Sequence, residues 1–237
     1  MLALVQAVPE IETRSGKPAI IIGGLAVICR LGGGYRATSD LDTVNRRSVD
    51  EPAQLEVLVS SGVARSDAVG VIIPTPAGDV KVDVLEVSDS DLQPLPEDPN
   101  DRLHVLSHAW AAETASFVTI GATDGTRDGY REVVTRVAEP GPLIAMKLQS
   151  VMNRPAAKEG TDLLDIVRLL LDRSTRAVAV EQLGEAGSVM RGDVRRHADL
   201  WFTQNRERTI RRIRAVNGGA EVDEATLDIV SALLLMG

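Results

Sequence analysis

The apolar positions of this chain follow two different periods, a strand-like one in the first half and a helix-like one in the second. Short β-branched or alternating runs at residues 18–22, 117–122 and 130–137 predict strands. Residues 69–73 and 79–87 flank a turn that contains proline and glycine, so they predict a hairpin. Together these runs predict a small mixed sheet.

Apolar residues at helical spacing predict helices around and after this sheet. A first helix over residues 1–13 should be limited by Pro9, and another should begin at Asp101 as its N-cap. Further helices are expected at residues 25–31, 51–61, 142–152 and 161–170, and from 181 to the end. We therefore expect an α/β (α+β) fold, with a mixed sheet and flanking helices in residues 1–139 and a helical domain in residues 140–237.

Candidate chemistry begins where the first strand turns into a helix, at Gly23 and Gly24. Two glycines let a ligand lie against bare backbone, and the first N–H groups of a helix favour an anion. Asp40 and Asp42 follow on either side of Leu41, and residues two apart in a strand share a face. Neighbouring carboxylates repel each other unless a cation lies between them. The pattern predicts a divalent metal and a nucleoside triphosphate.

These residues resemble the Gly-Gly … Asp-x-Asp signature of the polymerase-β-like nucleotidyltransferases. The segment 34–42, Gly-Tyr-Arg-Ala-Thr-Ser-Asp-Leu-Asp, resembles more narrowly the MenT/AbiE-type (AbiEii) toxins of toxin–antitoxin systems. The spacer between Gly24 and Asp40 is longer than in that family, and we assign the excess to the loop 31–35, where added length costs little. The resemblance implies a nucleotidyltransferase-type sheet with its active site in the cleft next to the helical domain.

The resemblance also implies roles for individual residues. Asp40 and Asp42 would hold Mg²⁺, or alternatively Mn²⁺, and a third carboxylate on a neighbouring strand would complete a two-metal site. Asp83 has that setting between two valines, although an exposed charge at a sheet edge is the alternative interpretation. Gly23 and Gly24 would present N–H groups to the phosphates, and Lys147 together with Arg36 would offset charge on the departing pyrophosphate.

A second motif lies in the predicted helical domain. Lys147 interrupts an apolar helix, a basic turn with Arg154 and Lys158 follows, and then come Asp162 and Asp165, which share a helix face. This order resembles the C-terminal motif of the MenT/AbiE-type enzymes. It implies a catalytic role for Lys147 and Asp162 and nucleotide binding by Lys147 and Asp165. Which of the two acids is the important one stays open, and an ordinary salt bridge is the alternative.

Charge is unevenly spread over the 237 residues, whose net charge is −8. Residues 191–214 hold eight arginines against three acids. Part of this segment is a candidate surface for an RNA backbone, and a solvated helix face is the alternative. The residues expected to contact RNA are Arg195, Arg208, Arg211 and Arg212. With no signal peptide or membrane-spanning run expected, the sequence favours a cytoplasmic protein.

We therefore expect a nucleotidyltransferase that transfers a nucleoside monophosphate from an NTP to an acceptor and releases pyrophosphate. Family resemblance points to the 3′ end of an RNA, with tRNA favoured, in a toxin that is restrained by a cognate antitoxin. One alternative is a small-molecule enzyme that modifies an aminoglycoside, for which the acidic segment 79–101 would suit a polycation. The other is a catalytically silent nucleotide-binding module, which the loss of any of the three carboxylates or of Lys147 would have favoured.

Overall fold

A computed structural model of the chain describes residues 1–33, 36–126 and 129–236. Gly34 and Tyr35, which belong to the predicted motif, lie outside the described residues, as do residues 127 and 128 of the turn expected at 123–129. The chain forms two compact units, which we call the sheet unit and the helical unit. The sheet unit comprises residues 1–29, 37–94 and 108–138, and the helical unit comprises residues 30–36, 95–107 and 139–237.

The sheet unit is built on one mixed sheet of seven strands, in the order β3-β4-β5-β2-β1-β7-β6. The pairs β1–β7 and β2–β5 are parallel, and the other neighbours are antiparallel. The strands are β1 (Ile20–Ile22), β2 (Leu41–Arg47), β3 (Ala64–Arg65), β4 (Gly70–Ile73), β5 (Val80–Ser88), β6 (Ser116–Ala122) and β7 (Arg131–Val137). The expected mixed α/β fold and the hairpin, which is β4–β5, are confirmed.

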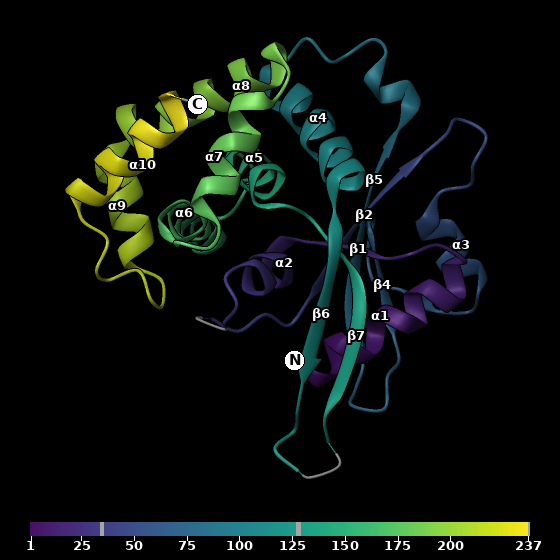
Figure 1. Ribbon diagram of the computed structural model, residues 1–237. Helices are drawn as coiled ribbons and strands as arrows, with labels where there is room; N and C mark the ends of the chain where they lie inside the picture. The colour runs from purple at the N-terminus through teal and green to yellow at the C-terminus, as the bar shows by residue number, and fades with distance from the viewer. Residues whose placement is uncertain (34–35, 127–128, 237) are drawn as a thin grey trace. The chain divides into compact units, whose positions relative to one another are not determined.

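Two helices of the sheet unit, α1 (Leu2–Ser15) and α3 (Gln54–Ser60), pack against each other and against β4 and β5, on the side of the sheet away from α2 (Gly23–Arg30) (Figure 1). The expectation that Pro9 limits the first helix is wrong, because Pro9 lies inside α1. Proline removes one backbone hydrogen bond there. The helix continues because a face on both sides of Pro9, including Val5, Val8 and Ile11, is buried.

The helix α4 (Pro99–Thr114) follows a short 3₁₀ helix, η1 (Asp89–Leu92), and differs from expectation at its start. Asp101 lies in the first turn and is not the N-cap. Asp98 accepts hydrogen bonds at Oδ1 from the backbone N–H groups of Asn100 and Asp101, at 2.8 and 3.1 Å. Asp98, and not Asp101, therefore satisfies backbone donors at the start of this helix.

Helices make up most of the helical unit, and α6 is at its centre. They are α5 (Pro140–Val151), α6 (Ala156–Leu171), α7 (Arg176–Glu185), α8 (Ser188–Asp199), the π-helical turn η2 (Leu200–Gln204), α9 (Arg206–Arg214) and α10 (Glu224–Met236). The α6 helix contacts α5, α7, α9 and α10. Trp201 and Phe202 are buried, so they pack in the core and do not present a base-stacking surface. In the described part of the chain, no helix combines the length and apolar character that crossing a membrane requires.

Candidate functional site

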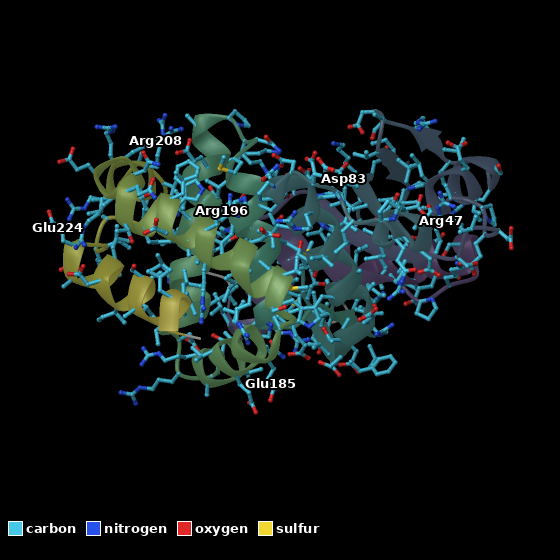
Figure 2. The ribbon with its side chains drawn as sticks, turned by 90° about the horizontal axis from the view of Figure 1, so that it is seen from above. Arg47, Asp83, Glu185, Arg196, Arg208 and Glu224 are labelled. Carbon is cyan, nitrogen blue, oxygen red and sulfur yellow. The ribbon has the colours of Figure 1, made fainter. Side chains whose placement is uncertain are left out.

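Two of the predicted carboxylates lie side by side on the sheet. Asp42 on β2 and Asp83 on β5 are direct partners in the parallel register (Figure 2 labels Asp83). Neighbouring strands are about 4.8 Å apart, and partners in register share a face. Leu41 and Val82, one residue earlier, are also partners and are buried on the other face. The alternation therefore aims both aspartates away from the core that holds Leu41 and Val82, and both are half-buried.

The absence of a side chain at Gly23 leaves space for the Asp42 carboxylate. It is the first residue of α2 and has φ of +65°, a conformation that side chains with a Cβ rarely adopt. A Cβ at this position would lie 2.0 Å from Asp42 Oδ2. Glycine is thus needed at position 23 for two reasons, the positive φ and the close approach of the Asp42 carboxylate to the backbone. Phosphate contact, the role expected for Gly23 from the sequence, stays a prediction, as does the role of Gly24.

A lysine that the sequence analysis did not place in the site contacts Asp83. Lys81 Nζ lies 3.0 Å from Asp83 Oδ1 and 2.8 Å from Asp67 Oδ2. Hydrogen bonds to Asp67 and then Asp83 raise the pKa of Lys81 above its ordinary value, so the amine is charged. Lys81 and Asp83 are two apart in a strand and so share a face, a signal that was readable in the sequence.

Asp40, the remaining predicted metal ligand, precedes β2 by one residue. Its Oδ1 accepts a hydrogen bond from Ser39 Oγ at 3.0 Å. Among the described residues, no set of three or more His, Cys, Asp or Glu side chains is arranged to hold a metal ion. Mg²⁺ commonly binds through one or two carboxylates together with substrate phosphates. The adjacent Asp42 and Asp83 fit that donor set, whereas a two-metal site that includes Asp40 stays a prediction.

The predicted residues of the second motif come together inside the helical unit. Lys147 Nζ on α5 donates to Asp162 Oδ1 at 2.7 Å and lies 2.6 Å from Asp165 Oδ2, both on α6. Arg36 binds Asp165 through two hydrogen bonds, from Nε at 3.1 Å and Nη2 at 2.8 Å. Arg154 Nε lies 3.4 Å from Asp162 Oδ2. We call these five residues the Lys147 cluster.

Three residues of the Lys147 cluster are buried, whereas Arg154 is exposed. Lys147, Asp162 and Asp165 are 6%, 7% and 0% exposed. Burial alone raises the pKa of Asp162, but Lys147 and Arg154 outweigh it and hold that pKa below its ordinary value. Burial raises the pKa of Asp165 well above its ordinary value, and the charge of Arg168 opposes that rise. The proposed action of Lys147 and Arg36 on pyrophosphate stays a prediction.

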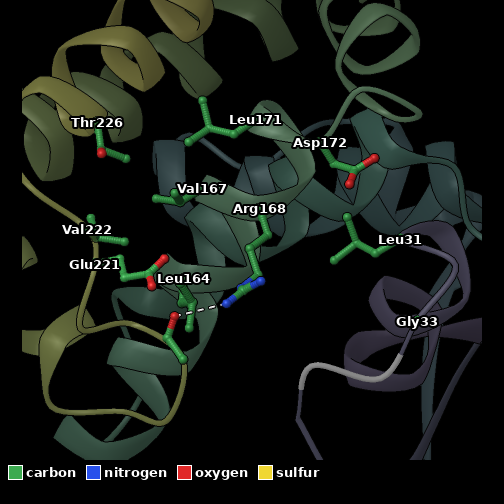
Figure 3. A pocket seen from close by; sticks show the side chains of 11 residues that line it. Leu31, Gly33, Leu164, Val167, Arg168, Leu171, Asp172, Glu221, Val222 and Thr226 are labelled. Atoms are coloured by element: carbon green, nitrogen blue, oxygen red, sulfur yellow. Dashed lines mark hydrogen bonds between the residues drawn. The ribbon is translucent and has the colours of Figure 1, made fainter.

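A cavity of the helical unit was not foreseen from the sequence. It has a volume of about 610 Å³ and is lined along one face of α6 and by the segment 218–226. Arg168 reaches across it and donates from Nη2 to the carbonyl oxygen of Gly218 at 2.9 Å (Figure 3). No predicted site residue is among the described residues that line it. The lining arises from chain segments far apart in sequence, so local patterns gave no signal for it.

The arginines predicted to bind RNA do not form one uniform surface. Arg195 lies on α8, and the π-helical turn η2 separates it from the other three on α9. Arg208 donates two hydrogen bonds, both 3.0 Å long, to the buried Glu159, and Arg212 Nε lies 3.6 Å from the same carboxylate. Arg195 and Arg211 are exposed. Glu159 therefore offsets part of the charge of Arg208 and Arg212.

Comparisons with known proteins add a likeness to solved structures. No protein-family model matches the chain. No curated protein matches it significantly either. The chain is similar to the crystal structure of an antigenic nucleotidyltransferase-like protein from Paracoccidioides brasiliensis, with 19% sequence identity and a TM-score of 0.48 over 90% of this chain and 92% of that one. This likeness assigns no activity to the chain.

Proposed function

We propose that this chain is a metal-dependent nucleotidyltransferase that transfers a nucleoside monophosphate from an NTP to a hydroxyl group. The observation that carries the proposal is the pairing of Asp42 with Asp83 on adjacent strands, with the Asp42 carboxylate against Gly23 at the start of α2. Carboxylates so placed repel each other unless a cation balances them. A helix N-terminus beside them favours the phosphates that such a cation accompanies.

The residues suit an in-line displacement. The acceptor oxygen forms a bond to the α-phosphorus of the NTP while the bond from that phosphorus to the pyrophosphate oxygen breaks. Asp83 takes the proton from the attacking hydroxyl as a general base. Asp42 and Asp83 would hold Mg²⁺, which when bound neutralises charge on the triphosphate. Glycine at position 23 allows this position of Asp42, because any larger residue would collide with the Asp42 carboxylate.

We further propose that the acceptor is the 3′ end of an RNA, with tRNA favoured, and that the enzyme is a toxin restrained by an antitoxin. The likeness of residues 34–42 to the MenT/AbiE-type toxins supports this. The exposed Arg195 and Arg211 supply positive charge that an RNA backbone would need.

A small-molecule acceptor is the second candidate, and one contact favours it. Glu159 binds Arg208 through both of its oxygens and lies near Arg212, which lowers the positive charge available for RNA. An aminoglycoside-type polycation would not need that charge. It would be attracted by acidic residues such as those of the segment 79–101.

The test is incubation of the protein with each of the four labelled NTPs, Mg²⁺ and either total RNA or a panel of aminoglycosides. Label on RNA supports the first candidate, and label on an aminoglycoside supports the second. The Asp83→Asn protein is the control for contaminating activity. Absence of transfer to every acceptor, with a well-folded protein and with Mn²⁺ also tried, would overturn the proposed reaction.

A further inference from the structure

Further charged side chains lie next to Asp83 on the side of β5 that faces β4 and the β3 edge of the sheet. Gly70 on β4 is the antiparallel partner of Asp83. A Cβ on Gly70 would lie 2.8 Å from Asp83 Oδ1, 2.4 Å from Ser66 Oγ and 3.0 Å from Asp67 Oδ1. The Asp83 carboxylate therefore lies directly over Gly70, together with Asp67, whose Oδ2 contacts Lys81.

Lys81 is shared between the carboxylates of Asp67 and Asp83. Its ammonium group lies 2.8 Å from Asp67 and 3.0 Å from Asp83, and its side chain is 35% exposed. Asp83 thus has a like charge, Asp42, on the strand β2 and an opposite charge, Lys81, on its own strand. The Lys81 ammonium offsets the repulsion that the aspartate pair would otherwise feel.

We propose that Lys81 is a counter-cation of Asp83 in the metal-free site. A divalent cation must then compete with Lys81 for Asp83, and Asp67 weakens the interaction of Lys81 with Asp83. This inference rests on the proposed metal-dependent function. A cation bound by Asp42 and Asp83 is repelled by the ammonium that contacts Asp83 Oδ1. Asp67 draws part of that ammonium's charge away from Asp83.

The arrangement predicts shifts of opposite sign for two neighbouring substitutions. Lys81→Met removes the competing cation, so metal binding should become tighter, on the order of tenfold. Asp67→Asn leaves Lys81 to neutralise Asp83 alone, so metal binding should become weaker by a factor of about three to ten. In the Lys81→Met/Asp67→Asn double variant, the effect of Asp67→Asn should largely disappear because it acts through Lys81.

The experiment is calorimetric titration of the full chain with MnCl₂ in the absence of nucleotide. The matched control is Lys17→Met, because Lys17 is also a half-exposed lysine of the sheet unit paired with a carboxylate, that of Glu51 at 3.2 Å. This control changes the net charge equally, and its Mn²⁺ affinity should stay near that of the wild type. Lys81→Arg, which keeps the charge, should also resemble the wild type and serves as the second variant if Lys81→Met does not fold.

The outcomes separate this inference from the proposed function. Tighter Mn²⁺ binding by Lys81→Met than by Lys17→Met supports the inference. Unchanged or weaker Mn²⁺ binding by a folded Lys81→Met protein overturns the inference, provided that Asp83→Asn has lost binding. The proposed metal site at Asp42 and Asp83 would still stand after that result. Failure of the wild type to bind Mn²⁺ overturns both.

Discussion

The two charged clusters of this chain differ in how their charges are balanced. In the sheet unit, Asp42 and Asp83 are half-buried neighbours, and the Lys81 ammonium is shared between Asp83 and Asp67. In the helical unit, Lys147 is buried between Asp162 and Asp165, and further cations cover both carboxylates. The carboxylates of the first pair are half-buried. The two aspartates of the second cluster are enclosed, and each contacts two cations.

From this difference we expect the first cluster to accept a cation and the second to stabilise the fold. A buried ion pair that loses one partner leaves an uncompensated charge in a medium of low polarity, which is costly. Half-exposed carboxylates can exchange one cation for another at much lower cost. We therefore expect substitutions in the sheet cluster to affect chemistry, and substitutions in the Lys147 cluster to affect stability first.

The largest effect is expected for Asp42→Asn. This change removes half of the carboxylate pair, so nucleotide transfer should fall by about a thousandfold or more. The melting temperature should change little, because asparagine keeps the size of the side chain and relieves the repulsion between residues 42 and 83. Turnover with labelled NTP and thermal unfolding of the same preparation provide the two measurements. Normal turnover in a folded Asp42→Asn protein would contradict the assignment of the site.

The next effect is on stability, through Lys147→Met. Removing the buried ammonium leaves each aspartate with a single arginine, so the free energy of unfolding should fall by about 3 kcal/mol, the lower end of the cost of breaking a buried ion pair. Urea denaturation measures this loss. The control is Lys158→Met, on the same helix as the two aspartates but exposed, which should change stability by about 0.5 kcal/mol or less.

The Lys147 experiment also tests the comparison between the two clusters directly. A Lys147→Met protein as stable as the wild type, but with a much lower turnover, would show that Lys147 acts on substrate, as the family resemblance implies. The Lys147 cluster would then be a second functional region and not a structural one.

A smaller effect on turnover should follow from Gly23→Ala. A Cβ at Gly23 collides with the Asp42 carboxylate, so turnover should fall by roughly a hundredfold as Asp42 moves. Gly16→Ala is the matched control: Gly16 has φ of +67°, near the +65° of Gly23, but nothing lies within 4 Å of its Cβ position. Gly16→Ala should lose about 1 kcal/mol of stability from backbone strain, and Gly23→Ala should lose more because of the collision with Asp42. Only Gly23→Ala should lose activity. Equal turnover by Gly23→Ala and Gly16→Ala would show that Gly23 is not part of the active site.

Local pattern predicted much of this fold because the elements are strongly periodic. The strand and hairpin runs became β1, β4, β5, β6 and β7, and the apolar repeats became α5 and α6. The two-residue strand β3 is too short to leave a period, and it was missed. Pro9 was misread because the burial of α1, a tertiary effect, outweighed its local preference.

The charged sites were predicted less completely, since contacts depend on the whole fold. That Asp83 would lie on a strand near Asp42 could be expected from its Val-Asp-Val setting. That the two would be exact register partners depends on how β2 pairs with β5. The hydrogen bond from Arg36 to Asp165 joins residues that are 129 apart in sequence. The contacts of Glu159 with Arg208 and Arg212 join α6 to α9. No local period encodes such pairs.

The smallest effect concerns RNA and distinguishes two arginines of α9. Arg211 is exposed and forms no ion pair with the described residues, whereas Arg208 is held by Glu159 through two hydrogen bonds. Each phosphate contact that is lost lowers the slope of log affinity against log salt by about one. Arg211→Ala should therefore lower the slope for RNA by about one, and Arg208→Ala by less, because Glu159 already offsets that charge. NTP affinity should stay unchanged in both, and Arg173→Ala, at an exposed arginine outside the segment 191–214, should leave the slope unchanged. A slope that does not respond to Arg211→Ala would remove this arginine from the RNA surface and favour the small-molecule acceptor.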